Sequence, residues 1–167
     1  PEWSRNAIIY EVNLRQYTPS ASVTEFASHL PRLKELGVDI LWFMPIHPIS
    51  ELNRKGELGS YYAVKDYKAF NPEFGTIDQF KEMVDSAHAL GMKVILDWVP
   101  NHTGCDNAWV AEHPEWFSVN EEGKMYGDDK MYTLPMMKST ELLYYDATYF
   151  NEHNIKVPTP WDEMEAT

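Results

Sequence analysis

Two stretches of the chain, residues 36–41 and 90–95, share one pattern, and this repeat constrains the fold more than any other feature of the sequence. Each begins with leucine and glycine, continues with three residues and then reaches an aliphatic residue within an apolar run. Glycine commonly ends a helix because it adopts the left-handed backbone without a Cβ penalty. A short apolar run bounded by such a turn is consistent with a buried strand. Each stretch therefore predicts a helix end, a tight turn and a strand.

The helices and strands around this repeat can be placed from the periodicity of apolar residues. Helical spacing predicts helices over residues 24–36 and 76–90, and Pro31 is expected to kink or restart the first of them. Thr76 and Gln79 form a capping box that starts the second helix. Buried strands are expected at residues 8–12, 40–44 and 94–96.

The order of these elements, strand–helix–strand–helix–strand, predicts an α/β fold with a parallel sheet and right-handed crossovers. An open sheet and part of a closed barrel both have this order, and periodicity alone does not choose between them. In both folds functional groups gather at the C-terminal ends of the strands. Residues 45–75 lack clear periodicity and are expected to form one long, partly ordered loop, which in compact domains is usually functional or disordered.

Polar side chains follow the expected strand at residues 94–96. Asp97, Asn101 and His102 place a carboxylate, an amide and an imidazole within one short segment. A carboxylate and an amide can ligate a hard cation or hold sugar hydroxyls, and a neutral imidazole can donate to a hydroxyl. The alternative is a strand end whose polar groups only satisfy the following loop.

Residues 97–102, Asp-Trp-Val-Pro-Asn-His, carry a specific resemblance. They resemble the first conserved region of the α-amylase family, glycoside hydrolase family 13, whose pattern is Asp-x-Val-x-Asn-His. Further segments resemble the family in order and spacing, at residues 7–12, 36–46, 59–67 and 71–76. The resemblance covers about residues 1–126 and implies the N-terminal portion of the catalytic domain, a partial (β/α)8 TIM barrel and not a complete one.

The resemblance also implies roles for matching positions. Tyr62 would stack under the sugar ring next to the scissile bond, and His102 would hydrogen-bond the hydroxyls of the same sugar. Asp97 would organise the site through hydrogen bonds and would not cleave the bond. Asn101 would be a calcium ligand in the members that contain calcium. The implied substrate is an α-glucan or maltooligosaccharide, and a complete parent enzyme would cleave or transfer α-1,4-glucosidic bonds with retention.

The catalytic carboxylates of the family have no counterpart in the sequence. Retaining glycosidases need one carboxyl group as nucleophile and one as acid/base. In this family the nucleophilic Asp has an Arg two residues before it, and none of the four Arg residues of this chain is followed in that way. We therefore predict that no catalytic residue is present and that the chain alone is inactive.

Residues 127–167 are expected to form a short α+β tail of different origin. The segment 133–146 is similar to part of bacterial extracellular sugar-binding proteins, and Lys124-Met125-Tyr126 is echoed by Lys130-Met131-Tyr132. This near-repeat suggests a junction between two unrelated genes. The alternative is a divergent amylase loop.

Charge and cysteine content exclude several classes of partner and site. The formal net charge is −12, which argues against nucleic acid and anionic membranes because both need a basic face. Cys105 is the one cysteine, so no internal disulfide can form. The sequence shows no signal peptide or transmembrane run, and the compartment stays unknown.

Three functional hypotheses remain open from the sequence. A hydrolase would release reducing ends from starch, a non-catalytic sugar-binding protein would show affinity without turnover, and a fusion with no evolved function would show neither.

A three-stranded sheet would also leave an uncapped edge, so self-association is expected unless the tail covers that edge.

Overall fold

The computed structural model describes residues 2–122, 124 and, for the backbone, 130–132. The chain divides into two compact units, residues 1–137 and 138–167, and the second unit lies outside the described residues, as does the predicted boundary at residues 126/127. The elements are η1 (Glu2–Ser4), β1 (Ile9–Val12), α1 (Leu14–Tyr17), α2 (Val23–Ala27), α3 (Leu30–Glu35), β2 (Ile40–Phe43), η2 (Pro72–Phe74), α4 (Ile77–Ala89), β3 (Lys93–Leu96), β4 (His102–Gly104), α5 (Trp109–Glu112), η3 (Pro114–Trp116) and β5 (Lys130–Tyr132).

The three predicted strands form one parallel sheet in the order β1-β2-β3. Tyr10 pairs with Leu41, and Leu41 pairs with Val94. The strands are therefore neighbours in the sequence order that the helix crossovers require, which confirms the predicted α/β architecture. Among the described residues the sheet does not close into a barrel.

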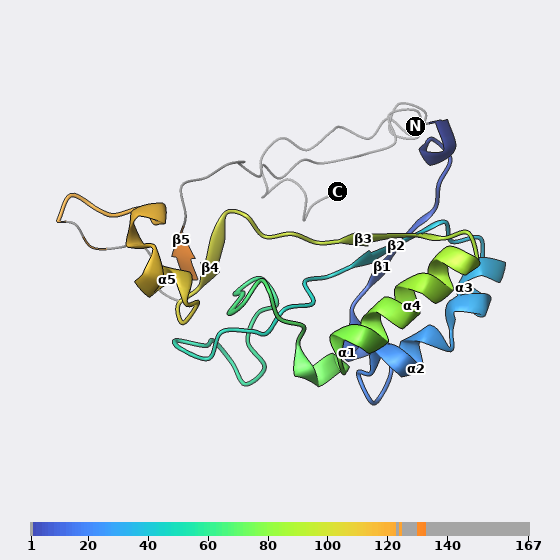
Figure 1. Cartoon of the computed structure of the whole chain (residues 1–167), viewed down its shortest axis with the longest axis horizontal. Helices are drawn as coiled ribbons and strands as arrows, with labels where there is room; N and C mark the ends of the chain where they lie inside the picture. Colours follow the sequence, from blue (N-terminus) through green and yellow to red (C-terminus); the bar gives the residue numbers. More distant parts are fainter. Residues whose placement is uncertain (1, 123, 125–129, 133–167) are drawn as a thin grey trace, which may run out of the picture. The chain divides into compact units, whose positions relative to one another are not determined.

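The helices α2, α3 and α4 cover a single face of this sheet (Figure 1). Strand side chains on that face enter the core, in which Phe43 is fully buried. The Phe43 ring meets Phe26 and Phe80 edge-to-face, at centroid distances of 5.3 and 5.5 Å. Aromatic rings prefer such offset or perpendicular arrangements. This cluster joins β2 to α2 and α4.

The opposite face of the sheet is exposed in the described part of the chain. Ile9 is 56% exposed and Ile95 is 44% exposed. Leu96 pairs with Phe43, on the face that the helices cover, and is also exposed at the end of β3. The prediction of a buried strand is therefore wrong at residues 94–96 and partly wrong at residues 8–12, whereas β2 is mostly buried. An apolar run shows that a strand can be covered on both faces, but here helices cover only one of them.

The two halves of the sequence repeat end their helices in the same way. The N–H of Val38 donates to the carbonyl of Leu33 at 3.1 Å, and the N–H of Met92 donates to that of Ala87 at 3.0 Å. These are the six-to-one hydrogen bonds of Schellman motifs. The intervening Gly37 has φ +97° and Gly91 has φ +76°. The predicted role of both glycines is confirmed.

The helix starts also follow the sequence signals. The predicted helix over residues 24–36 is divided into α2 and α3, and Pro31 lies in the first turn of α3, so the expected restart is confirmed. Proline is tolerated there because the first N–H groups of a helix have no intrahelical acceptor. Both hydrogen bonds of the Thr76–Gln79 capping box are present at the start of α4.

The predicted long loop, residues 45–75, is ordered by contacts with distant residues. It contains η2 and one isolated bridge between Ile49 and Val64. The carbonyl of Val64 accepts from the N–H of Gly104 at 2.8 Å, which fastens the loop to β4. β4 in turn pairs antiparallel with β5, whose residues the sequence assigned to the tail.

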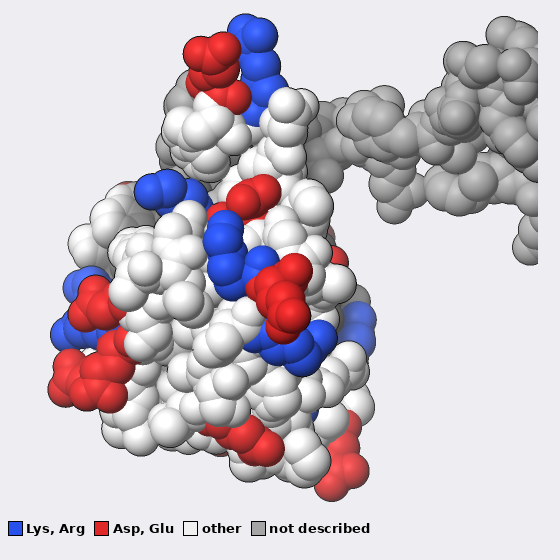
Figure 2. All heavy atoms as spheres, turned by 90° about the vertical axis from the view of Figure 1, so that its right-hand side faces the viewer, with Lys and Arg blue, Asp and Glu red and all other residues white. Residues whose placement is uncertain are grey.

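Figure 2 shows acidic and basic side chains interspersed on one face, without a broad field of one sign. Among the described residues, none of the helices combines the length and apolar character needed to cross a membrane. β1 and β3 are the outer strands of the parallel sheet, and association through these edges stays a prediction.

Candidate functional site

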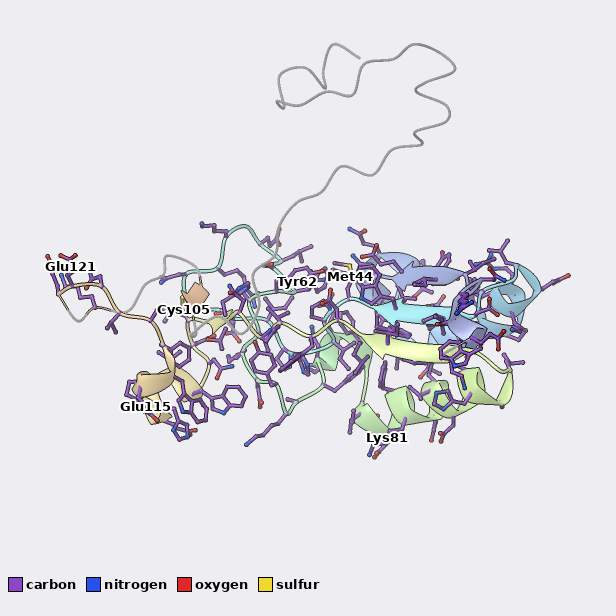
Figure 3. The ribbon with its side chains drawn as sticks, turned by 90° about the horizontal axis from the view of Figure 1, so that it is seen from above. Met44, Tyr62, Lys81, Cys105, Glu115 and Glu121 are labelled. Carbon is purple, nitrogen blue, oxygen red and sulfur yellow. The ribbon has the colours of Figure 1, made fainter. Side chains whose placement is uncertain are left out.

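Asp97 and Tyr62 come from different elements and meet through a hydrogen bond. Asp97 follows β3 directly, and its N–H donates to the carbonyl of Phe43 at 2.9 Å. The Tyr62 hydroxyl, from the loop after β2, donates to Asp97 Oδ2 at 2.8 Å. Figure 3 shows Tyr62 and Met44 at the end of the sheet where the strands pass into the loops. The pair therefore lies at the C-terminal ends of the strands, where this type of fold carries its sites.

Asn101 and His102 form the second part of the candidate site. Nδ2 of Asn101 lies 3.3 Å from Nδ1 of the His102 ring. The preceding Val99 is buried and fixes the path of the chain from β3 to β4. The structure thus joins Tyr62 to Asp97 and Asn101 to His102. Both pairs lie on the chain that leaves the carboxyl ends of β2 and β3.

The Tyr62–Asp97 hydrogen bond alters the acidity of the tyrosine. Burial, followed by the hydrogen bond to Asp97 and the negative charge of that carboxylate, raises the pKa of Tyr62 to about 12. Burial also raises the pKa of Tyr67 to about 12. Both hydroxyls therefore remain protonated donors at neutral pH.

These two tyrosines predict that the protein loses stability in strong alkali. Because their pKa values are raised above the ordinary value of 10.0, folding holds their protons more tightly. This stabilisation is fully present below about pH 10 and is lost as the pH rises through about 12. Urea unfolding between about pH 9 and 12 should show a falling free energy of unfolding, with a shallower fall in Tyr62→Phe. Parallel curves for the variant and the wild type would contradict this assignment.

Asn101 is the predicted calcium ligand. Calcium takes about six to eight oxygen ligands. Among residues 2–122 and 124, no group of three or more His, Cys, Asp or Glu side chains could hold a metal ion. Main-chain and amide oxygens also bind calcium, so calcium at Asn101 stays a prediction, and no step of the proposed function depends on it.

A cleft of about 420 Å³ is lined by Arg15 and by residues of the loop between β2 and α4, and it does not include the four candidate residues. Its charged walls are engaged with one another. Arg15 binds Glu73 through two hydrogen bonds of 2.5 and 2.6 Å, and Lys65 binds Glu51 at 2.8 Å. We therefore assign the candidate site to the strand ends and not to this cleft.

The loop also contains residues whose predicted or missed roles the structure defines. His47 Nδ1 lies 3.0 Å from the carbonyl of Ala69, and Asp66 accepts from the N–H of Lys68 at 2.8 Å, so both side chains make local contacts within the loop. Tyr67 was missed. Its contacts join residues more than thirty positions away, and no local spacing in the sequence distinguishes it from the other nine tyrosines.

Comparison with known proteins identifies the family. The family model described as "Alpha amylase, catalytic domain" matches residues 23–162. The chain belongs to the α-amylase family. An α-amylase from Lactobacillus plantarum has 47% sequence identity and a TM-score of 0.75, over 77% of this chain and 32% of that one. The fold of the described sheet and helices is therefore part of the TIM barrel of this family.

Sequence relatives of the chain include several members of this family. It is 35% identical to an alpha-1,4-glucan:maltose-1-phosphate maltosyltransferase from Salinibacter ruber, over 75% of this chain and 22% of the relative. It is 36% identical to a trehalose synthase from Pimelobacter sp., over 88% of this chain and 24% of the relative. The chain thus spans about a quarter of the length of these two relatives.

The family match runs through most of the predicted tail. It extends to residue 162, so the resemblance of residues 127–167 to a sugar-binding protein is not confirmed. The structure of residues 133–167 lies outside the described part of the chain.

Proposed function

We propose that this chain supplies the sugar-holding part of an α-amylase-type site. In this proposal Tyr62 stacks under a glucose ring of an α-glucan or maltooligosaccharide, and His102 hydrogen-bonds the hydroxyls of that ring. Asp97 holds the Tyr62 hydroxyl and keeps the ring plane in place. Calcium at Asn101 takes no part in this proposal.

The observation that supports this proposal is the 2.8 Å hydrogen bond between Tyr62 and Asp97 at the end of β3. The two residues are 35 positions apart. The alternative hypothesis is that the polar residues after β3 only form hydrogen bonds within the following loop. That hypothesis does not require a partner so distant in the sequence. An aromatic side chain fixed at its hydroxyl presents a rigid apolar surface at small cost in conformational entropy, which suits stacking against a sugar.

We further propose that the parent enzyme cleaves or transfers α-1,4-glucosidic bonds with retention, and that this chain alone binds without turnover. A retaining mechanism needs two carboxyl groups about 5–5.5 Å apart on either side of the bond. No Arg of the 167 residues has an Asp two positions after it, which is the family pattern at the nucleophile. The relatives named as a maltosyltransferase, a trehalose synthase and an α-amylase support glucan chemistry in the parent.

Binding of maltoheptaose to the purified chain tests this proposal. We expect saturable binding by calorimetry and an upward shift of the melting temperature, because a ligand that binds only the native state stabilises it. Tyr62→Ala removes the stacking surface and should weaken binding at least about tenfold, equivalent to about 1.4 kcal/mol. Tyr62→Phe keeps the ring but loses its hydrogen bond to Asp97, so it should weaken binding less than Tyr62→Ala does.

The control variant is Lys81→Ala, on the exposed side of α4, which should bind as the wild type does. Equal affinity in Tyr62→Ala and wild type would contradict the stacking role. Release of reducing ends from starch by the chain alone would contradict the absence of turnover. A chain that binds no maltoheptaose would favour the remaining hypothesis of a fusion without evolved function.

A further inference from the structure

The Tyr67 hydroxyl contacts the main chain on both sides of the segment that carries Asn101 and His102. It lies 2.5 Å from the carbonyl oxygen of Val99 and 2.8 Å from that of His102. A phenol has a single O–H, so the two carbonyls share one donor. The two acceptor carbonyls are three residues apart. The shared hydrogen bond therefore ties together the two ends of the segment that leads from β3 into β4.

The ring of Tyr67 is itself held on two sides. It stacks on Trp109 at a centroid distance of 5.2 Å and an interplanar angle of 14°, and His47 meets it at 5.6 Å. Such aromatic pairs contribute about 0.5–1.5 kcal/mol beyond their buried area. The hydroxyl therefore has little freedom to leave the two carbonyls by rotation of the ring.

Trp109 is connected back to the same loop. Its backbone N–H donates to Asn107 Oδ1 at 3.0 Å, and Asn107 Nδ2 donates to the carbonyl of Val64 at 3.2 Å. Val64 is three residues before Tyr67, and Asn107 is buried. A continuous set of contacts therefore links the loop to Asn107, Asn107 to Trp109, and Trp109 to Tyr67. Tyr67 in turn contacts the segment that leads to His102.

We propose that Tyr67 is a positioning residue, which fixes the turn of residues 99–102 and thereby aims His102 at the bound sugar. This inference rests on the proposed function for its sugar-binding consequence. Its structural part concerns the turn alone. Tyr67 acts through His102 and has no contact with the sugar in this proposal.

The test compares Tyr67→Phe with Tyr17→Phe in the full chain. Tyr67→Phe removes the shared donor and keeps the ring stack. Tyr17→Phe removes a hydroxyl that accepts from Arg32 at 2.7 Å, away from this turn. The readouts are the imidazole NMR signals of His102 and His88, and the affinity for maltoheptaose. His88 belongs to α4 and serves as the internal reference.

In Tyr67→Phe we expect shifted His102 signals, unchanged His88 signals and an affinity about fivefold lower, equivalent to one net hydrogen bond. Tyr17→Phe should leave both histidines and the affinity unchanged. Trp109→Leu, which keeps the hydroxyl and removes the stack, should also shift the His102 signals. If Tyr67→Phe does not fold, Trp109→Leu provides the test of the positioning role in its place.

The outcomes separate this inference from the proposed function. If the wild type binds no maltoheptaose, the proposed function fails, and the His102 signals alone still decide the role of Tyr67. Unchanged His102 signals in Tyr67→Phe and Trp109→Leu would overturn the positioning role. Equal shifts of His102 and His88 would overturn it as well, because they would indicate a general structural effect.

Discussion

Replacement of Phe43 by alanine is expected to lower the free energy of unfolding by about 3–5 kcal/mol. Phe43 is fully buried at the C-terminal end of β2, and its ring meets aromatic side chains of both α2 and α4. Truncation would leave a cavity between the sheet and the helices, and the rings around it cannot all collapse into the space. Urea denaturation monitored by circular dichroism would measure the loss.

The control for Phe43→Ala is Ile95→Ala, on the neighbouring strand. Ile95 is 44% exposed on the open face of the sheet, so its truncation removes less buried area and should cost less, about 1–2 kcal/mol. Equal losses in the two variants would show that both faces of the sheet are covered in solution. That result would contradict the single-layer arrangement of helices described above.

Replacement of Gly75 by alanine is expected to cost about 2–4 kcal/mol, from backbone strain of about 1–3 kcal/mol and loss of the helix cap of about 1 kcal/mol. Gly75 has φ +118° and ψ −140°, a conformation that residues with a Cβ rarely adopt. A Cβ there would lie 2.5 Å from Oε1 of Gln79, the side chain that accepts from the N–H of Thr76. The substitution therefore strains the turn and disrupts the capping box at once.

Gly91→Ala provides the matched comparison for Gly75→Ala. Gly91 also has a positive φ, of +76°, but a Cβ there would meet nothing within 4 Å. Only the left-handed backbone penalty of about 1–2 kcal/mol applies. Thermal unfolding of the two variants would measure the difference, and a larger loss in Gly91→Ala would contradict the steric account of Gly75.

The parts of the fold that the sequence predicted correctly are those fixed by local interactions. Thr76 and Gln79 are three residues apart, and the glycines at 37 and 91 act within one turn of their helices, so short patterns identified these helix ends. The apolar content of β3 predicted a strand correctly but a buried one wrongly. Burial depends on what packs on each face, and an apolar run does not specify that.

The candidate site was predicted by resemblance, and its geometry was not. Asp97 and His102 belong to one short motif, but the partner of Asp97 is Tyr62, and the turn before His102 is held by Tyr67. Both tyrosines lie in the aperiodic loop of residues 45–75. Its path is set by distant contacts such as Arg15 with Glu73, 58 positions apart. No local period encodes contacts of this range.

The two halves of the repeat are not paired residue for residue in the sheet. The repeat makes Leu41 equivalent to Ile95, whereas hydrogen bonding pairs Leu41 with Val94, an offset of one residue. With a rise of about 3.3 Å per residue and a strand spacing of about 4.8 Å, this offset tilts the strands by about 35° to the axis that relates the two units. A barrel of eight strands with a shear of eight has a tilt of about 36°. The one-residue offset between β2 and β3 therefore matches the shift per strand that a barrel of eight strands with a shear of eight requires.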